Sequence, residues 1–322
     1  MHNGEQTLGK CLEALYRSKY PPYEVIVVDD CSTDNTLVVA RRFPCRVIEL
    51  KTNCGAASAK NRGTEKVSGD VVFFTDADVI VEEGSLSLIA EDLADPGISG
   101  VVGLLSPELG YNNFSSQYKN LWMHYTYARL PHHVGVFYTS AAAIRRAVFQ
   151  QTTGFDENYC GASVTEDTEF GQRLLTAGHT IYLDKRLIVR HDKYYSLAGL
   201  ARTDFWRSHG LTKTMLRNRF GETKQRSYTS VPWFFVLSVP LSCLVVLSLL
   251  FSLASRDTRF LAAALVCYGI MLLLNAPFLV FLIRTRGLFF LAQSCGFLLL
   301  DMFVAGLGVI FATAGFIMGK RY

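Results

Sequence analysis

Short apolar runs alternate with helical patterns along the first two thirds of the chain. Runs typical of strands buried on both faces occur at 24–28, 46–50 and 71–74. Apolar positions at helical spacing lie before and between them, at 5–18, 36–43 and 56–67. Alternating strands and helices joined by short loops predict a parallel sheet with right-handed crossovers and helices on its faces.

The same reading extends toward residue 190. It predicts helices over 85–93, 111–129 and 165–176, and strands over 100–104, 134–144, 180–183 and 187–189. The alternation also calls for a strand ahead of the first helix, where only Met1 and His2 precede Asn3. Either the reading frame has been started too late or the protein lacks a central strand, and we adopt the first alternative. The expected strand would lie beside 24–28 and help to form the ligand pocket.

Three long apolar segments occupy the end of the chain, at 231–254, 260–283 and 288–318. Because about 20 apolar residues span a bilayer as a helix, we predict membrane helices; the alternative is core helices of a soluble domain. The third segment is longer than one upright helix needs and is predicted to bend or to form a hairpin. Asp301 near its middle marks either a functional residue or that bend. The predicted organisation is a domain over 1–195, a helical interfacial linker over 196–230 and a membrane region over 231–322.

Charge and cysteine content refine this picture. A net charge of +4 is too small to indicate nucleic-acid binding, whereas the basic stretch 213–226 would hold the domain against anionic headgroups. The start of the chain has no signal-peptide pattern, and the eight cysteines have no regular spacing. We therefore expect a multi-pass membrane protein with reduced thiols and its first domain on the cytoplasmic side.

Two carboxylates, Asp76 and Asp78, directly follow the apolar run 71–74. Side chains at the carboxyl end of such a strand project into the crevice where open α/β sheets bind ligands. Two carboxylates suit Mg²⁺ or Mn²⁺, whose remaining positions are usually filled by water and substrate phosphates. The pair thus predicts a metal site for a phosphorylated ligand. A solvated acidic turn that caps the next helix is the alternative interpretation.

Five short motifs together make the chain resemble the family 2 glycosyltransferases of GT-A fold, in a membrane-anchored form. They are Val27–Asp34, Asn53–Gly55 with Ala59–Gly63, Asp76–Asp78, Gly154–Asp156 and Thr165–Asp167. The resemblance covers Asn3 to about His191. It implies a GT-A-like α/β fold, with a mixed, mainly parallel sheet flanked by helices, and inverting transfer of a sugar from a nucleoside diphosphate.

The resemblance also implies roles for single residues at the reacting centre. Asp76 and Asp78 would bind the metal, with Asp76 shared with the donor ribose. His191 would complete the metal shell, unless it is a structural or exposed histidine. Asp167 matches the family's general base, and Glu166 would orient the acceptor or the loop.

Further residues match the donor-binding positions of the family. Asp30 resembles the residue that hydrogen-bonds the nucleobase, with Asp29 beside it. Lys60 stands where arginine is usual, so that the charge is kept but bidentate hydrogen bonding is lost. Arg207, next to Trp206, would contact the donor diphosphate or an acceptor phosphate. A plain amphipathic interfacial helix explains Arg207 equally well.

The stretch Arg202–Trp206 bears on whether transfer is processive. Polysaccharide synthases of this family carry Gln-x-x-Arg-Trp there, and this chain keeps only the tryptophan, which favours single-sugar transfer. We expect a UDP- or GDP-sugar donor, Mg²⁺ or Mn²⁺, and a lipid-linked or glycan acceptor at the membrane surface. The alternatives are a polysaccharide synthase and a nucleotide-sugar-binding membrane protein without catalysis.

Overall fold

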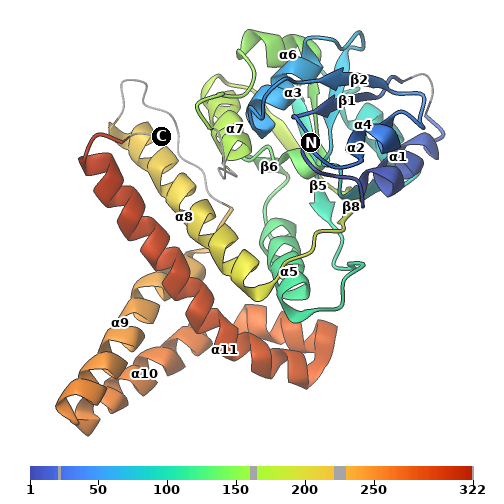
Figure 1. Cartoon of the computed structure of the whole chain (residues 1–322). Helices are drawn as coiled ribbons and strands as arrows, with labels where there is room; N and C mark the ends of the chain where they lie inside the picture. Colours follow the sequence, from blue (N-terminus) through green and yellow to red (C-terminus); the bar gives the residue numbers. More distant parts are fainter. Residues whose placement is uncertain (21–22, 160–164, 221–229, 321–322) are drawn as a thin grey trace.

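The computed structural model describes residues 1–20, 23–159, 165–220 and 230–320. An α/β part and a group of long helices lie side by side (Figure 1). The helices of the α/β part are α1 (Leu8–Tyr16), α2 (Thr36–Ala40), α3 (Ala56–Thr64), α4 (Ser85–Asp92), α5 (Phe114–Ala128), α6 (Arg146–Gln151) and α7 (Glu166–Thr176). Its strands are β1 (Ile26–Asp29), β2 (Arg46–Glu49), β3 (Val71–Phe74), β4 (Val79–Val81), β5 (Gly100–Leu105), β6 (His133–Val134), β7 (Ala142–Arg145) and β8 (Ile181–His191).

The strands form two separate sheets. β1 and β2 pair in parallel, and a six-stranded sheet has the order β3-β7-β5-β8-β4, with β6 also paired to β8. In the larger sheet β5 and β8 are parallel, while β7 runs antiparallel to both of its neighbours. The predicted α/β class, a mixed sheet with helices on its faces, is confirmed.

Three predicted strands differ from the structure. The predicted strand 134–144 is wrong, because the chain leaves the sheet after β6, makes a short 3₁₀ turn at Thr139–Ala141 and returns as β7. α7 packs directly on the backbone of the stretch between them: a Cβ at Gly171 would come within 2.8 Å of the Phe137 amide nitrogen. The two pieces predicted at 180–189 form the single strand β8, and a register shift against β5 between Val102 and Leu104 absorbs the irregularity.

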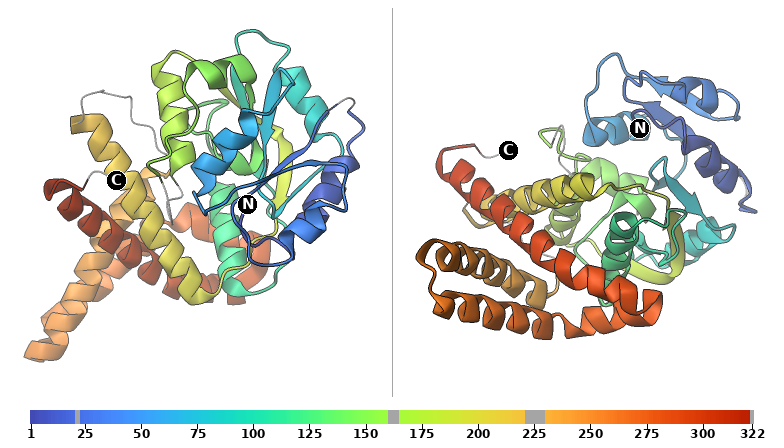
Figure 2. Two further views of the ribbon diagram at one scale, coloured as in Figure 1. Left: turned by 45° about the horizontal axis from the view of Figure 1, so that its top comes forward. Right: turned by 60° about the horizontal axis from the view of Figure 1, so that its bottom comes forward.

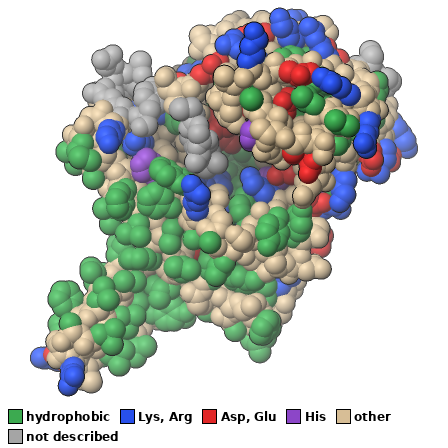
Figure 3. All heavy atoms as spheres, viewed as in Figure 1, with side chains coloured by type: hydrophobic (Ala, Val, Ile, Leu, Met, Phe, Trp, Pro, Cys, Tyr) green, Lys and Arg blue, Asp and Glu red, His purple; other side chains and the backbone are tan. Residues whose placement is uncertain are grey.

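Four helices make up the remainder: α8 (Leu197–Phe220), α9 (Trp233–Ser255), α10 (Thr258–Leu274) and α11 (Ala276–Ile317). The predicted apolar segment 260–283 is divided at Asn275 between α10 and α11. The backbone of α11 departs from helical geometry at Gly287 (φ 83°), just ahead of 288–318, and continues as helix to Ile317. The bend or hairpin predicted within 288–318 is therefore wrong. By length and composition α9 and α11 would cross a membrane, whereas α10 has 17 residues. Apolar side chains gather on the surface of this part (Figure 3), which supports membrane association.

The long helices pack in pairs. α8 runs along the second half of α11, and α9 lies beside α10 in both views of Figure 2. α8 and the first half of α11 both lie next to α5, and Arg286 of α11 donates to the Gln117 side chain of α5 at 2.9 Å. Both helices therefore contact the α/β part.

The helical part is joined to the α/β part through buried polar contacts. Asp301 of α11 is buried beside Asp204 of α8 and accepts a hydrogen bond of 3.5 Å from the Tyr118 hydroxyl of α5. Asp204 in turn forms a buried ion pair with Lys119. Asp301 therefore marks the junction of three helices and lies well beyond the break at Gly287.

The predictions for the basic stretch 213–226 and for the cysteines can be compared with the structure only in part. Residues 213–220 of the basic stretch continue α8, and 221–226 lie outside the described residues. Seven cysteines are described and all are free thiols, as expected, whereas Cys160 lies outside the described ranges.

Candidate functional site

Strand pairing brings the acidic pair to a histidine far along the sequence. Asp76 follows β3, and Asp78 immediately precedes β4. β4 runs antiparallel to β8 with Val79 opposite His191, so His191 arrives next to Asp78. Its Nε2 atom lies 3.1 Å from Asp78 Oδ1. The backbone closes the corner, because the amide of Asp192 donates to the Asp78 carbonyl at 2.8 Å.

The three side chains Asp76, Asp78 and His191 fit a divalent cation. One ligand atom from each lies within 4.8 Å of the others. Within the described ranges His191 Nε2 makes no hydrogen bond of normal geometry, although it lies 3.1 Å from Asp78 Oδ1, so the two atoms are close enough to bind the same cation. Two carboxylate oxygens with one imidazole nitrogen are a donor set for a first-row divalent ion or Mg²⁺. The structure brings together the three residues that the sequence grouped, and their role as metal ligands stays a prediction.

Asp76 is held as a carboxylate by its neighbours. Burial opposes ionisation, but the charges of Lys60 and His191 and a hydrogen bond from Ser140 keep the pKa of Asp76 below its ordinary value. The Ser140 hydroxyl donates to Asp76 Oδ2 at 2.6 Å. An ionised Asp76 is the form that binds a cation.

Lys60 of α3 bonds to the acidic helix α7 and lies within the electrostatic field of Asp76. Its ammonium donates to Glu166 Oε1 at 3.0 Å and to the Thr139 hydroxyl. Burial alone would lower the pKa of Lys60, but the negative charges of Glu166, Asp76 and Asp167 outweigh it and raise that pKa. Lys60 therefore stays charged between the two groups of carboxylates.

Asp167 and Glu166 form the first turn of α7 and differ in their surroundings. Glu166 is buried, and its Oε1 atom accepts a hydrogen bond from Lys60. Asp167 Oδ1 accepts from the Thr168 amide at 2.6 Å. Burial, reinforced by repulsion from Glu166, raises the pKa of Asp167 to about 7, against the lowering effect of Lys60 and Arg207. A carboxyl group with that pKa can take up a proton near neutral pH.

Asp30 and Asp29 end β1 and shape the loops beside the crevice. Both oxygens of Asp30 accept backbone hydrogen bonds, from Cys54 at 2.7 Å and Gly55 at 2.8 Å, so the side chain clamps the loop that leads into α3. Asp29 Oδ2 accepts from the Ser32 amide at 3.1 Å. Both carboxylates are buried. The structure thus shows them positioning backbone, and their predicted contact with a nucleobase stays a prediction.

Arg207 reaches the site from outside the sheet. It lies on α8, where its guanidinium donates to the Tyr127 hydroxyl at 3.4 Å and contacts Met123 Sδ at 3.0 Å. Burial would lower the pKa of Arg207, but the Tyr127, Asp204 and Asp167 charges raise it. The structure thus places Arg207 in the electrostatic field of Asp167, as a cation facing the α/β part.

Three polar residues at the site escaped prediction. Thr139 and Ser140 contact Lys60 and Asp76 from the 3₁₀ turn before β7, a stretch that was predicted to be strand. Lys193 follows β8, and the charges of Asp78 and Asp76 contribute to raising its pKa. The only signal for Lys193 was its place two residues after His191.

Comparison with known proteins relates the first half of the chain to glycosyltransferases. Residues 1–153 match the sequence model described as glycosyl transferase family 2. The chain is 28% identical over 131 residues to glycosyltransferase GlyG of Streptococcus pneumoniae, covering 39% of this chain and 42% of that protein. It is also 28% identical over 177 residues to the pre-mycofactocin glycosyltransferase of Mycobacterium tuberculosis, covering 52% of this chain and 37% of that one. The chain thus matches less than half the length of these relatives.

A solved structure extends the likeness in fold beyond that region. The mannosyltransferase PcManGT from Pyrobaculum calidifontis, solved with GDP-Man and Mn²⁺, superposes with a TM-score of 0.57 at 18% identity. The superposition covers 99% of this chain and 86% of the other. At that identity the likeness concerns the fold alone.

Proposed function

We propose that this chain, whose residues 1–153 match the model of glycosyl transferase family 2, transfers a sugar, with inversion, from a UDP- or GDP-sugar to an acceptor at the membrane. The observation that carries the proposal is the position of Lys60. Its ammonium donates to Glu166, and the charges of Asp76 and Asp167 both act on it. One buried cation therefore lies between the proposed metal ligands and a carboxyl group suited to proton transfer.

The donor diphosphate would bind at the cluster of Asp76, Asp78 and His191 through Mg²⁺ or Mn²⁺. The bound cation would supply positive charge against the charge that develops on the leaving diphosphate. Asp30 and Asp29 shape the neighbouring loops and would line the nucleoside pocket. Lys60, Arg207 and Lys193 would add fixed positive charge around the diphosphate.

Asp167 would act as the general base. Inversion requires an acceptor hydroxyl to attack the sugar carbon from the face opposite the leaving group, and the hydroxyl proton then passes to the Asp167 carboxylate. A pKa of about 7 leaves a useful fraction ionised at neutral pH while making the group a better proton acceptor than an ordinary carboxylate. Glu166, fixed by Lys60, would hold the first turn of α7 in place.

An acceptor at the membrane follows from the place of α8. The helix carries Arg207 toward the site and also packs on α11, where a Cβ at Gly308 would come within 2.5 Å of the Phe205 carbonyl. The same helix therefore contacts the site and an apolar helix. A lipid-linked hydroxyl lying along those helices would be held at high effective concentration.

Nucleotide release tests this proposal. The full chain, in membranes or detergent, is incubated with a panel of UDP- and GDP-sugars, with Mg²⁺, Mn²⁺ or chelator. We expect metal-dependent release of nucleotide that Asp78→Asn and Asp167→Asn each reduce by at least about a hundredfold. Asp70→Asn is the matched control, because that carboxylate, just before β3, is fully exposed. Metal-dependent turnover that survived both substitutions would refute the site assignment.

A further inference from the structure

A guanidinium from the long helices holds the loop 106–113, which connects β5 to α5. Arg286 lies in α11 directly before Gly287, where the helical backbone is interrupted. Its side chain is 22% exposed, and it donates to the Pro107 carbonyl at 2.8 Å and to Gln117 Oε1 at 2.9 Å. Within the described ranges no other residue of α8–α11 hydrogen-bonds to this loop. Arg286 is therefore the polar link between the loop and the helical part.

Gln117 of α5 extends this support to the other end of the loop. Its side-chain oxygen accepts from Arg286, and its amide nitrogen donates to the Tyr111 carbonyl at 2.6 Å. Arg286 thus fixes Pro107 directly and Tyr111 through one intermediate. The residues 108–110 lie between these two anchored positions. Because both flanking carbonyls are held, the path of 108–110 depends on the guanidinium.

Gly110, in this short stretch, contacts the corner that contains two of the proposed metal ligands. Its amide donates to Asp192 Oδ1 at 2.9 Å, and the Asp192 amide donates to the Asp78 carbonyl at 2.8 Å. Asp192 directly follows His191. A Cβ at position 110 would lie 3.1 Å from Asp192 Oδ2, so the backbone of the loop packs directly on that carboxylate. The position of Gly110 is therefore coupled to the positions of Asp78 and His191.

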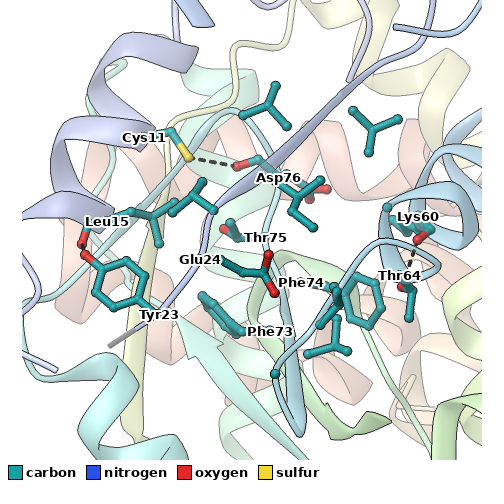
Figure 4. Close-up of a pocket in the computed structure, with 18 of the residues that line it drawn as sticks. Cys11, Leu15, Tyr23, Glu24, Lys60, Thr64, Phe73, Phe74, Thr75 and Asp76 are labelled. Carbon is teal, nitrogen blue, oxygen red and sulfur yellow. Dashed lines mark hydrogen bonds between the residues drawn. The ribbon is translucent and has the colours of Figure 1, made fainter. Parts of the chain in front are cut away.

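The loop also borders a pocket beside Asp78. Asp76 and Lys60 border a cavity of about 630 Å³ that is lined by α1 and α3 (Figure 4), whereas Asp78 borders a second pocket of about 110 Å³. The lining of the second pocket consists of Gly110 and Tyr111 of the loop, Gln6, Thr7 and Lys10 at the start of α1, and Asp78, Ile80 and Asp192. A shift of the loop would therefore change the surroundings of Asp78 while leaving those of Lys60 in place.

We propose that Arg286 is a positioning residue for the divalent-cation site. By anchoring the loop 106–113 it keeps Asp78 and His191 in the geometry that binds Mg²⁺ or Mn²⁺, as residues behind metal ligands do in other sites. The inference rests on the proposed function, which makes those two residues metal ligands. It also gives the joint of α11 at Gly287 a role at the site, because the affinity for the cation depends on where the long helices hold Arg286.

The test measures binding and hydrogen exchange as well as turnover, in the full chain in detergent. Arg286→Gln removes the forked donor, and Arg284→Gln, at an exposed arginine of the same helix, is the matched control. In Arg286→Gln we expect faster hydrogen exchange at the Gly110 amide and about tenfold weaker Mn²⁺ binding, measured from the EPR signal of the free ion. Arg284→Gln should show neither change.

Turnover distinguishes positioning from a general effect on folding. In Arg286→Gln the Mn²⁺ concentration for half-maximal nucleotide release should rise by the same factor as the dissociation constant, with kcat at saturating metal nearly unchanged. A lower kcat with an unchanged metal requirement would mean that Arg286 only maintains the fold, and would overturn the proposal.

A substitution in the loop reaches the same contact from the other side. Gly110→Val places a side chain against Asp192 and should also weaken Mn²⁺ binding about tenfold. Gly84→Val is its control, since a Cβ there would meet no atom within 4 Å. If both substitutions act through one contact, the double variant of Arg286→Gln with Gly110→Val should bind Mn²⁺ no more weakly than either single variant.

The two proposals fail separately. Absence of turnover with every nucleotide sugar would contradict the proposed function, whereas Mn²⁺ affinity and Gly110 exchange are measured without a donor. Unchanged Mn²⁺ affinity in Arg286→Gln, or a double variant in which the two losses multiply, would overturn the role of Arg286.

Discussion

Gly308 of α11 lies against Ser208 of α8 with no room for a side chain. A Cβ at position 308 would overlap the Ser208 hydroxyl oxygen. Ser208 directly follows Arg207, which faces Tyr127 and the charge of Asp167. This close approach of the two helices therefore sits next to the cation that they bring to the site.

A larger side chain between α8 and α11 should lower activity, although the substitution lies outside the candidate site. Gly308→Leu would push α8 away from α11 and displace Arg207, and shifts of about 1 Å at such groups can cost about a hundredfold in rate. We expect nucleotide release to fall at least about tenfold. Gly296→Leu is the control on the same helix, since a Cβ there would meet no atom within 4 Å. Equal activity of the two variants would contradict a role for this contact.

The raised pKa of Asp167 predicts an acid limb in the pH profile of activity. The group is protonated below about pH 7, so kcat/KM should rise with pH and level off above that value. Asp167→Asn should remove the limb together with most of the activity. The same shift bears on stability: because the folded state holds this proton up to a higher pH than the unfolded chain, stability from this group should fall as pH rises from about 4 to about 7.

Lys60 should set the position of that limb. Its charge lowers the pKa of Asp167, so Lys60→Gln should move the acid limb to higher pH as well as weaken donor binding. Lys60→Arg keeps the charge and should leave the limb near pH 7. Initial rates measured from about pH 5.5 to about pH 9 distinguish the two variants, and an unmoved limb in Lys60→Gln would show that another group titrates.

His191 should govern the affinity for metal. Removing its ring nitrogen in His191→Ala leaves the two carboxylates of Asp76 and Asp78, and we expect about ten- to a hundredfold more Mn²⁺ for half-maximal nucleotide release. Activity at saturating metal should recover in part. His133→Ala, at an exposed histidine of β6, is the matched control. An unchanged metal requirement in His191→Ala would exclude His191 from the cation site.

The buried pair of Lys119 and Asp204 should matter for stability. Removing one partner leaves an uncompensated buried charge, which typically costs about 3–5 kcal/mol, so Lys119→Met should lower the thermal unfolding midpoint strongly. The double variant Lys119→Met with Asp204→Leu should recover much of that loss. Lys19→Met, which breaks an exposed pair with Glu83, should change the midpoint little.

The sequence predicted most of the elements that deliver the site. Apolar runs before Asp30 and Asp76 marked their strands, because strands buried on both faces leave a clear pattern. β4 was missed since three residues are too few to show a period. Ser140 and Thr139 were missed because their contacts with Asp76 and Lys60 bridge 64 and 79 residues, and no local pattern records such pairing.

Arg207 shows where sequence reasoning stops. Its neighbourhood was equally consistent with an interfacial helix and with a donor contact, and in the structure α8 both packs on an apolar helix and turns Arg207 toward Tyr127. The face of α8 that is turned toward the sheet is set by the packing of α8 on α5 and α11, which the sequence pattern does not record.

The two contacts of α8, with the candidate site and with α11, have a practical consequence for studying this protein. A fragment trimmed to residues 1–195 would retain the sheet and the Asp76, Asp78 and His191 cluster, yet it would lack the guanidinium that α8 contributes. Such a fragment would contain only part of the proposed site, however well it behaved in solution. Detergent or lipid around the long helices is therefore a kinetic variable in its own right, to be chosen with the same care as buffer and metal.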